Sequence, residues 1–354
     1  MAGVLVADGA MGTEILRARL GPEDYGGHPG CHDYLSVSRP DLIESIHRAY
    51  LAAGCRALTT NSFQAHPLSL QEHGLADQAF DIARAAARLA RQAAGNGPDA
   101  PLVLGSMGPG TRLPSLGHVT FAELRRGYAV QAAGLLEGGA DRILVETCQD
   151  PLQAKAAILG AHDADRAVPV IAHFTVEAAG AMLLGTETAA AAASLLPLGI
   201  AGIGLNCATG PAEMSEHLRV LAELADVPVG VVPNAGMPAI GDDGEARYSL
   251  SPADLADWLV RYVRQYGVAL VGGCCGTTPA HLAAVVKRLA AEGLADPAPS
   301  AAEGAAGGRA DGIGQVARSG KSGPGGLVAS LYQAVDLRQD LAYLAVGERA
   351  NANG

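Results

Sequence analysis

Residues 142–164 read RILVETCQDPLQAKAAILGAHDA, and the assignment of the fold rests on the pattern within them. The run Ile143-Leu144-Val145 is apolar without polar alternation, as in a strand that is buried on both faces of a parallel sheet. A helix is predicted from Pro151, because proline suits the first helical turn, where its missing N–H costs nothing. Glu146 stands at the end of the apolar run. The stretch therefore predicts a strand, a turn that carries a carboxylate, and a helix.

Eight such units occur before residue 292, which matches the (β/α)8 barrel (the TIM barrel, an α/β fold) in number and length. An open, doubly wound sheet is the alternative, but it would more often carry a phosphate-binding Gly-x-Gly-x-x-Gly sequence after its first strand. The residues at that place, Asp8-Gly9-Ala10-Met11-Gly12, lack this sequence, so the barrel is preferred. The predicted strands are Val4–Val6, Ala57–Phe63, Pro101–Gly108, Arg142–Thr147, Val168–Val176, Ala201–Cys207, Val227–Val232 and Ala269–Gly273. The predicted helices are Pro40–Ala53, Gln78–Ala94, Phe121–Glu137, Pro151–Ala164, Thr186–Leu196, Pro211–Leu224, Pro252–Tyr266 and Pro279–Ala291, several of which close on a glycine that accepts a left-handed conformation (Gly54, Gly95, Gly138 and Gly267).

The composition excludes several classes of protein. The 354 residues are 49% apolar and 17% charged, which rules out a disordered chain. No stretch approaches the roughly 20 apolar residues that span a bilayer, and residues 1–20 lack the basic start of a signal peptide. The net charge of −11 argues against nucleic acid and anionic membranes as partners, since both need a basic face. Six cysteines without an export signal indicate a reducing compartment, and we expect a cytoplasmic protein.

The composition changes after Glu292. Residues 296–326 are dominated by alanine, glycine, proline and serine without apolar periodicity, which is typical of a flexible linker. Apolar residues return over 327–354. We therefore expect a barrel domain over residues 1–292, a flexible linker over 293–326 and the beginning of a further structured unit over 327–354. A lone first strand exposes its N–H and C=O groups, so this last segment should be disordered or lie loosely on the barrel.

Cysteines gather at the predicted carboxyl ends of the strands, where such barrels carry their chemistry. Cys207 ends the sixth strand, and Cys274 and Cys275 follow the eighth within GGCCGTT, residues 272–278. Neighbours on a regular strand point to opposite faces, so this pair shares one metal only if the backbone leaves strand geometry, which flanking glycines allow. Three thiolates favour zinc and leave a fourth position open for a substrate. The alternative is a pair of small buried residues that close a barrel strand.

The remaining metal-ligating residues are weaker candidates. Cys148 lies near the same rim and is a possible fourth ligand, whereas Cys31 lies in a long loop and Cys55 is expected in the core. His173 lies in a predicted strand and is interpreted as a core histidine, with a position at the rim as the alternative. A zinc hydrolase would need histidine or carboxylate ligands and a base at the metal, and the all-cysteine rim argues against it.

Two carboxylates share the predicted rim. Asp8 ends the first strand and Glu146 ends the fourth. Beside a centre of three thiolates they would be poor partners for an anionic substrate and would suit an ammonium group. Each could instead cap a neighbouring backbone N–H, and for either residue alone the two interpretations stay open.

Seven motifs follow one another along the chain: DGAMGT (8–13), TNSF (60–63), GSMGP (105–109), ET (146–147), GLNC (204–207), PNAG (233–236) and GGCCGT (272–277). On these motifs and their order, over about residues 4–289, the chain resembles the homocysteine S-methyltransferases. One residue, Ser62, departs mildly, since threonine is more usual there. The tail Val346–Gly354 is similar to the opening strand of the folate-binding barrel in cobalamin-dependent methionine synthases, with Ala350 where threonine is usual. The resemblance therefore implies an N-terminal homocysteine module that ends at the start of a folate-binding domain.

The resemblance implies roles for individual residues. The zinc ligands would be Cys207, Cys274 and Cys275, and Asn234 would lie beside the metal. No catalytic side chain is implied, because the metal-activated thiolate of the substrate is itself the nucleophile. The residues implied to meet homocysteine are Asp8, Gly9, Ala10, Met11, Gly12, Asn61, Ser106, Glu146 and Asn234, with Asp8 and Glu146 on the amino group and the backbone of 9–12 with Ser106 on the carboxylate.

The methyl donor is less well defined by the sequence. The tail favours methylcobalamin, but the chain has no Asp-x-His-x-x-Gly cobalamin-binding sequence, so this cofactor would bind elsewhere than in this chain. 5-Methyltetrahydrofolate would be engaged only through a following domain. The alternatives are a stand-alone enzyme that uses S-methylmethionine or betaine, fusion to a flavin-dependent folate reductase, and a module that binds zinc and homocysteine without turnover.

Overall fold

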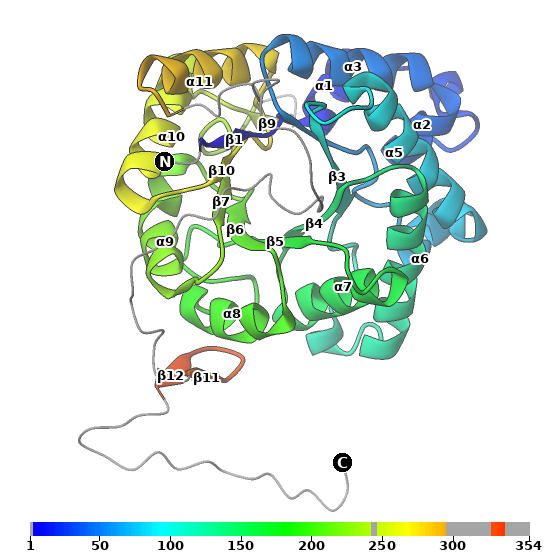
Figure 1. The fold of residues 1–354 in the computed structure, drawn as a ribbon. Helices are drawn as coiled ribbons and strands as arrows, with labels where there is room; N and C mark the ends of the chain where they lie inside the picture. Colours follow the sequence, from blue (N-terminus) through cyan, green and yellow to red (C-terminus); the bar gives the residue numbers. More distant parts are fainter. Residues whose placement is uncertain (1–2, 242–245, 295–326, 337–354) are drawn as a thin grey trace, which may run out of the picture.

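Eight parallel strands form a barrel, which confirms the predicted (β/α)8 fold (Figure 1). The computed structural model describes residues 3–241, 246–294 and 327–336. The sheet order is β1-β10-β7-β6-β5-β4-β3-β2, and a parallel bridge between Ala7 and Ala57 closes the ring. Two backbone hydrogen bonds accompany the bridge, from Arg56 N to the Val6 carbonyl at 2.8 Å and from Asp8 N to the Ala57 carbonyl at 3.0 Å. The carboxyl ends of all eight strands therefore meet at one mouth.

The strands and helices alternate along the chain. The barrel strands are β1 (Leu5–Val6), β2 (Ala57–Thr59), β3 (Leu102–Met107), β4 (Arg142–Cys148), β5 (Val170–Phe174), β6 (Gly202–Asn206), β7 (Val229–Val232) and β10 (Leu270–Val271). The principal helices around them are α3 (Pro40–Ala52), α5 (Ala79–Ala94), α6 (Phe121–Glu137), α7 (Pro151–Ala164), α8 (Thr188–Leu195), α9 (Pro211–Leu224), α10 (Pro252–Tyr266) and α11 (Pro279–Ala291). Short helices α1 (Met11–Arg17), α2 (Leu35–Ser38) and α4 (Pro67–Leu70) lie in the loops that follow β1 and β2.

Two apolar cores hold the barrel together. A small cluster fills its interior and includes Leu104, Leu144 and Ile171. A much larger cluster lies between the strands and the helices, and Val145 and Phe174 belong to it. Residues next to one another on a strand thus alternate between the two cores, which explains the continuous apolar runs. Burying each such side chain stabilises the fold by roughly 1.5–3 kcal/mol.

The helix ends follow the sequence pattern with one correction. Gly54, Gly95 and Gly267 have positive φ, as predicted. Gly138 was predicted to do the same, but its φ is −73° and Gly139 adopts the positive φ of 101° instead. Gly138 is needed for space: a Cβ there would lie 2.5 Å from the carbonyl oxygen of Arg84 on α5. This glycine therefore allows α5 and α6 to approach closely.

The second strand is shorter than predicted. It ends at Thr59, although the apolar pattern suggested that it continues to Phe63. Beyond Thr59 the chain turns, with the Ser62 N–H donating to the carbonyl of Thr60 at 2.9 Å. The motif at residues 60–63 therefore lies in the loop at the barrel mouth.

In the part of the chain that the structure describes, two hairpins lie outside the barrel sheet. Strands β8 (Ala239–Ile240) and β9 (Ala246–Arg247) pair antiparallel in the connection from β7 to α10. Strands β11 (Leu327–Ala329) and β12 (Ala334–Asp336) form the second hairpin, which lies beside α8 (Figure 1). The Glu187 N–H donates to the carbonyl of Tyr332 at 2.9 Å and so ties this hairpin to the start of α8. The predicted linker, apart from residues 293–294, and the folate-domain strand over 346–354 lie outside the described residues.

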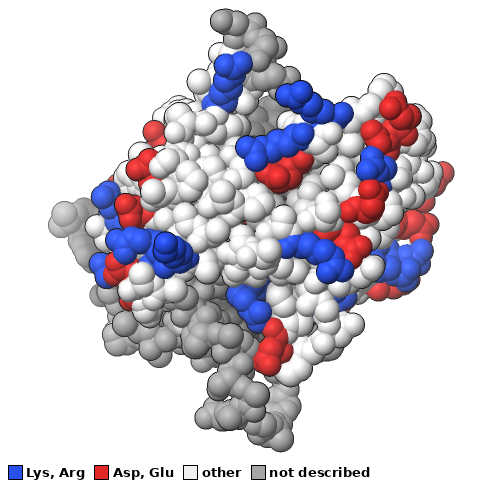
Figure 2. Space-filling model, turned by 90° about the horizontal axis from the view of Figure 1, so that it is seen from above, with Lys and Arg blue, Asp and Glu red and all other residues white. Residues whose placement is uncertain are grey.

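Many charged side chains on the surface form ion pairs. Figure 2 shows acidic and basic side chains lying next to one another on one face, with uncharged surface between them. Examples are Arg125 with Asp163 at 2.6 Å and Arg219 with Glu216 at 2.7 Å. Among the helices described, none combines the length and apolarity needed to cross a membrane.

Candidate metal and substrate site

A cavity of about 740 Å³ opens at the carboxyl ends of the strands. Its walls come from loops that follow strands distant in the sequence. Asp8 and Glu146 lie on one part of the wall, and Cys207, Cys274 and Cys275 lie on another. The barrel therefore brings the predicted carboxylates and the predicted thiol ligands to one cavity.

The three cysteine thiols lie together. The Sγ atoms of Cys207 and Cys275 are 3.8 Å apart, those of Cys274 and Cys275 are 4.0 Å apart, and all three lie within 4.8 Å of one another. An ion bound tetrahedrally at the Zn–S length of about 2.3 Å needs sulfur atoms separated by about 3.8 Å. The thiols thus fit a zinc-sized ion with little movement.

The backbone at both strand ends leaves regular geometry to bring these thiols together. Cys207 and Ala208 follow β6 with φ of 61° and 57°, a left-handed conformation that is uncommon for residues other than glycine. Strand β10 ends at Val271, before the cysteine pair. Cys274 N then donates to the carbonyl of Pro233 at 2.8 Å, which fixes the metal loop, residues 272–278, against the end of β7.

Asn234 follows β7 and is not among the residues that line the cavity. It is buried, and its Oδ1 atom has no hydrogen-bond partner among the described residues. The next residue, Ala235, donates its N–H to the carbonyl of Cys275 at 2.9 Å. An unpaired buried oxygen is costly, so Asn234 has an acceptor available to a ligand or a metal.

The three thiols differ in their pKa. Hydrogen bonds from the thiols of Cys207 and Cys274 hold the pKa of Cys275 below its ordinary value, and the hydroxyl of Tyr248 adds a further hydrogen bond. Tyr248 follows β9 and packs against Gly276, where a Cβ would lie 2.2 Å from the ring. The hairpin β8–β9 therefore presents a hydroxyl donor to the thiol cluster.

Asp8 is buried at the end of β1. Its carboxylate accepts hydrogen bonds from the Thr59 N–H at 2.8 Å and from the Thr59 hydroxyl at 2.7 Å. Burial nevertheless raises the pKa of Asp8 from 3.8 to about 7, and the charge of Glu146 contributes to the rise. The hydrogen bonds to the Asp8 carboxylate come from Thr59 and not from a basic side chain, so the cavity favours a cationic ligand at this carboxylate.

Glu146 occupies a similar environment at the end of β4. Its carboxylate accepts hydrogen bonds from the Ser106 hydroxyl at 2.5 Å and, more weakly, from the Asn206 amide at 3.4 Å. Burial raises the pKa of Glu146 from 4.5 to about 7. Ser106, on the neighbouring strand β3, and Asn206, at the end of β6 two strands away, thus hold the carboxylate in place.

The other residues that were predicted to contact the substrate differ in whether their polar groups already have hydrogen-bond partners. Asn61 lines the cavity, but its amide donates to the His32 carbonyl at 2.8 Å and to the Ser36 hydroxyl at 3.1 Å. The loop of Gly9, Ala10, Met11 and Gly12 also lines the cavity and leads into α1, whose first N–H groups have no partner within the helix.

Cys148 lies away from the thiol cluster. Regular alternation along β4 would place it on the same face as Leu144 and Glu146. A register shift between Val145 and Cys148, with a φ of 58° at Thr147, turns the Cys148 side chain into the core between strands and helices instead. The suggestion of Cys148 as a fourth ligand is therefore unsupported by the geometry.

Several cavity residues were not identified from the sequence. Asp33 is buried, accepts a hydrogen bond from the Gln64 N–H at 2.8 Å, and has its pKa raised to about 6 by burial. His173 was interpreted as an ordinary core histidine. It does lie inside the barrel, but both ring nitrogens lack partners among the described residues and it faces the cavity. The sequence did not identify these roles, because they depend on which loops and strands the closed barrel brings together.

The mouth of the barrel thus combines three converging thiols with two carboxylates in one cavity. The sequence matches the homocysteine S-methyltransferase family over residues 5–289. The chain therefore belongs to the homocysteine S-methyltransferase family, and the predicted methyltransferase class is confirmed.

Two mycobacterial methionine synthases and one bacterial homocysteine methyltransferase structure agree with this assignment. The methionine synthase of Mycobacterium tuberculosis is 46% identical over 358 residues, which cover 99% of this chain and 28% of that protein. The methionine synthase of Mycobacterium leprae is 45% identical over 361 residues, with the same coverage of 99% and 28%. The chain thus corresponds to one module of these longer proteins. The metallated form of the homocysteine methyltransferase MmuM from Escherichia coli has a TM-score of 0.66 at 26% identity, covering 81% of this chain and 96% of that one.

Proposed function

We propose that this chain is a zinc-dependent homocysteine S-methyltransferase module, which binds homocysteine and forms methionine. The observation that carries the proposal is the convergence of Cys207, Cys274 and Cys275, within 4.8 Å of one another, in a cavity that also holds Asp8 and Glu146. The metallated form of MmuM supports a metal in this family, and the three thiolates favour zinc.

The chain's own residues account for substrate recognition. Cys207, Cys274 and Cys275 would hold the ion and leave one position open. Asp8 and Glu146 would receive the ammonium group, whose charge compensates the desolvation that raises the pKa of both carboxylates. The substrate carboxylate would meet the backbone of residues 9–12. In its unliganded form the site would keep Asn234 Oδ1 near the metal, since that oxygen has no other described partner.

The chemistry requires no general base during methyl transfer. When bound, zinc supplies a position at which the thiol of homocysteine loses its proton, and the thiolate is the nucleophile. The barrel walls orient the sulfur toward the open mouth. There its lone pair forms the new S–C bond, while the methyl carrier leaves with the electron pair of the bond that breaks.

The methyl donor would come from outside this chain. The chain spans 28% of the length of the methionine synthases it matches. We propose methylcobalamin, held by another part of a longer protein or by another chain, as the donor, with 5-methyltetrahydrofolate engaged through a following domain. S-Methylmethionine and betaine are the alternative donors.

Metal analysis and a methylation assay test this proposal. Zinc content and methionine formation from methylcobalamin should be measured for wild type, Cys207→Ala and Cys148→Ala, with S-methylmethionine and betaine as competing donors. We expect about one zinc per chain in wild type and in Cys148→Ala, and loss of most zinc and turnover in Cys207→Ala. Full zinc occupancy in Cys207→Ala would contradict the ligand assignment, and binding of homocysteine without turnover by any donor would indicate a binding module only.

A further inference from the structure

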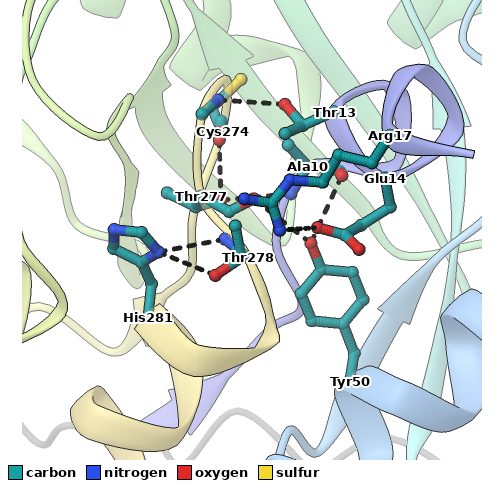
Figure 3. Close-up of polar contacts among 10 residues, drawn as sticks. Ala10, Thr13, Glu14, Arg17, Tyr50, Cys274, Thr277, Thr278 and His281 are labelled. Carbon is teal, nitrogen blue, oxygen red and sulfur yellow. Dashed lines mark hydrogen bonds and ion pairs between the residues drawn. The ribbon is translucent and has the colours of Figure 1, made fainter. Parts of the chain in front are cut away.

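Two loops of the site, far apart in the sequence, are joined by one buried hydroxyl. Thr277 follows the cysteine pair, and its Oγ1 donates to the carbonyl of Cys274 at 2.7 Å. The same oxygen accepts a hydrogen bond from the N–H of Ala10, in the loop between β1 and α1, at 3.2 Å. Figure 3 shows Thr277 between these two residues. One side chain thus uses both of its hydrogen-bonding functions to connect the metal loop with the head-group loop, residues 8–13.

A second hydroxyl, on the head-group loop, forms a hydrogen bond with the backbone of the metal loop. Thr13, at the start of α1, accepts a hydrogen bond at Oγ1 from the N–H of Gly276 at 3.0 Å. Tyr50, from α3, lies behind both loops, and its hydroxyl contacts the carbonyls of Ala10 at 3.3 Å and Thr277 at 3.5 Å. Each loop therefore contributes one threonine to the other (Figure 3).

The packing leaves little freedom around the connection. Thr277 is fully buried. A Cβ added at Gly9 would lie 2.8 Å from Thr277 Oγ1, and one added at Gly273 would lie 2.4 Å from the same atom. Because glycine on each loop touches Thr277 directly, displacement of one loop must displace the other.

We propose that Thr277 and Thr13 are positioning residues that couple the binding of the metal to the binding of the amino-acid head group of the substrate. The inference rests on the proposed function, in which one loop carries two metal ligands and the other meets the substrate carboxylate. Ordering of either loop by its ligand pre-orders the other through the two hydroxyls. The coupling must be reciprocal, so the head group raises metal affinity by the same factor as the metal raises head-group affinity.

The coupling can be measured without the thiol of the substrate. L-α-Aminobutyrate has the amino-acid head of homocysteine and no sulfur, so it reaches the head-group loop without ligating the metal. Cobalt(II) can replace zinc as a visible probe of the thiolate site. In wild type, saturating α-aminobutyrate should raise cobalt affinity by about fivefold or more, the lower range of measured allosteric couplings, and should shift the cobalt absorption bands.

Matched variants separate coupling from general stability. Thr277→Val keeps the shape of the side chain and removes the hydroxyl, so the gain in cobalt affinity should fall below about twofold and the band shift should disappear. Thr277→Ser should restore both. Thr278→Ala is the control, because its hydroxyl contacts His281 at the start of α11 and, among the described residues, forms no hydrogen bond with the head-group loop. This control should lower thermal stability and keep the coupling.

The outcomes distinguish this inference from the proposed function. If wild type binds cobalt and α-aminobutyrate but neither affects the other, the inference is wrong while the proposed function stands. If wild type binds neither, both fail. Unchanged coupling in Thr277→Val would also overturn the inference. Should Thr277→Val fail to fold, Thr13→Val tests the second connection, which lies at the less buried end, and retention of full coupling there would count against the proposal.

Discussion

Replacing Glu146 with glutamine should weaken substrate binding and, at the same time, stabilise the unliganded protein. The glutamine side chain still accepts the hydrogen bond that Ser106 donates to Glu146, but it carries no charge for the ammonium group. A hydrogen bond to a charged group contributes about 1.5–3 kcal/mol, so homocysteine affinity should fall by about 10- to 150-fold. Metal content should not change, because Glu146 lies outside the thiol cluster.

The effect on stability has the opposite sign. The pKa of Glu146 is raised from 4.5 to about 7, so the folded protein holds this proton more tightly than the unfolded chain. The resulting stabilisation is complete below about pH 4.5 and is lost as the pH rises through about 7. The full difference corresponds to about 3 kcal/mol. Since Glu146 is only partly buried, we expect unliganded Glu146→Gln to be more stable than wild type by about 1–2 kcal/mol at about pH 8.

The two effects require separate assays. Calorimetric titration with homocysteine and with γ-mercaptobutyrate, which lacks the amino group, measures the head-group contribution at constant zinc content. Urea unfolding between about pH 5 and pH 8 measures the stability difference, which should grow with pH. An equal loss of affinity for both thiols would refute the ammonium role of Glu146. A stability difference that does not depend on pH would refute the assignment of a desolvated carboxylate.

Two further predictions concern the periphery of the site and the end of the domain. Tyr248→Phe removes a hydroxyl that hydrogen-bonds Cys275, so a chelator should extract zinc several times faster than from wild type while the overall fold persists; an unchanged extraction rate would exclude this contact. A chain cut after Leu294 should keep zinc, homocysteine binding and nearly the full Tm. A cut after Glu292 should lower the Tm by several degrees, because it removes Leu294, whose carbonyl accepts a hydrogen bond from the N–H of Val4 at 3.0 Å and whose side chain packs on the core. Equal Tm values for the two cuts would place the domain boundary at Glu292, as the composition alone suggested.

Much of the architecture could be predicted from local patterns in the sequence. Short apolar runs without alternation are typical of strands that are buried on both faces, and proline at the first turn marks the start of helices such as α7 and α11. Parallel strands in a barrel end at one mouth, so the sequence alone predicts that residues at strand ends, such as Glu146 and Cys207, line one cavity.

The tertiary structure decided which side chains meet within that mouth. Period-two alternation places Cys148 on the face of Glu146, but a backbone irregularity at Thr147 turns it into the other core. The contact between Ala10 and Thr277 joins residues 267 positions apart, and neither has a local pattern that predicts it. Strand periodicity determines which face a side chain lies on only where the backbone is a regular strand. In loops the backbone is not regular, so the pattern does not predict where a side chain points. Local sequence patterns therefore determine the number of strands and their order along the chain. The contacts of the site arise from loops, and the geometry of these loops depends on the closed barrel beneath them.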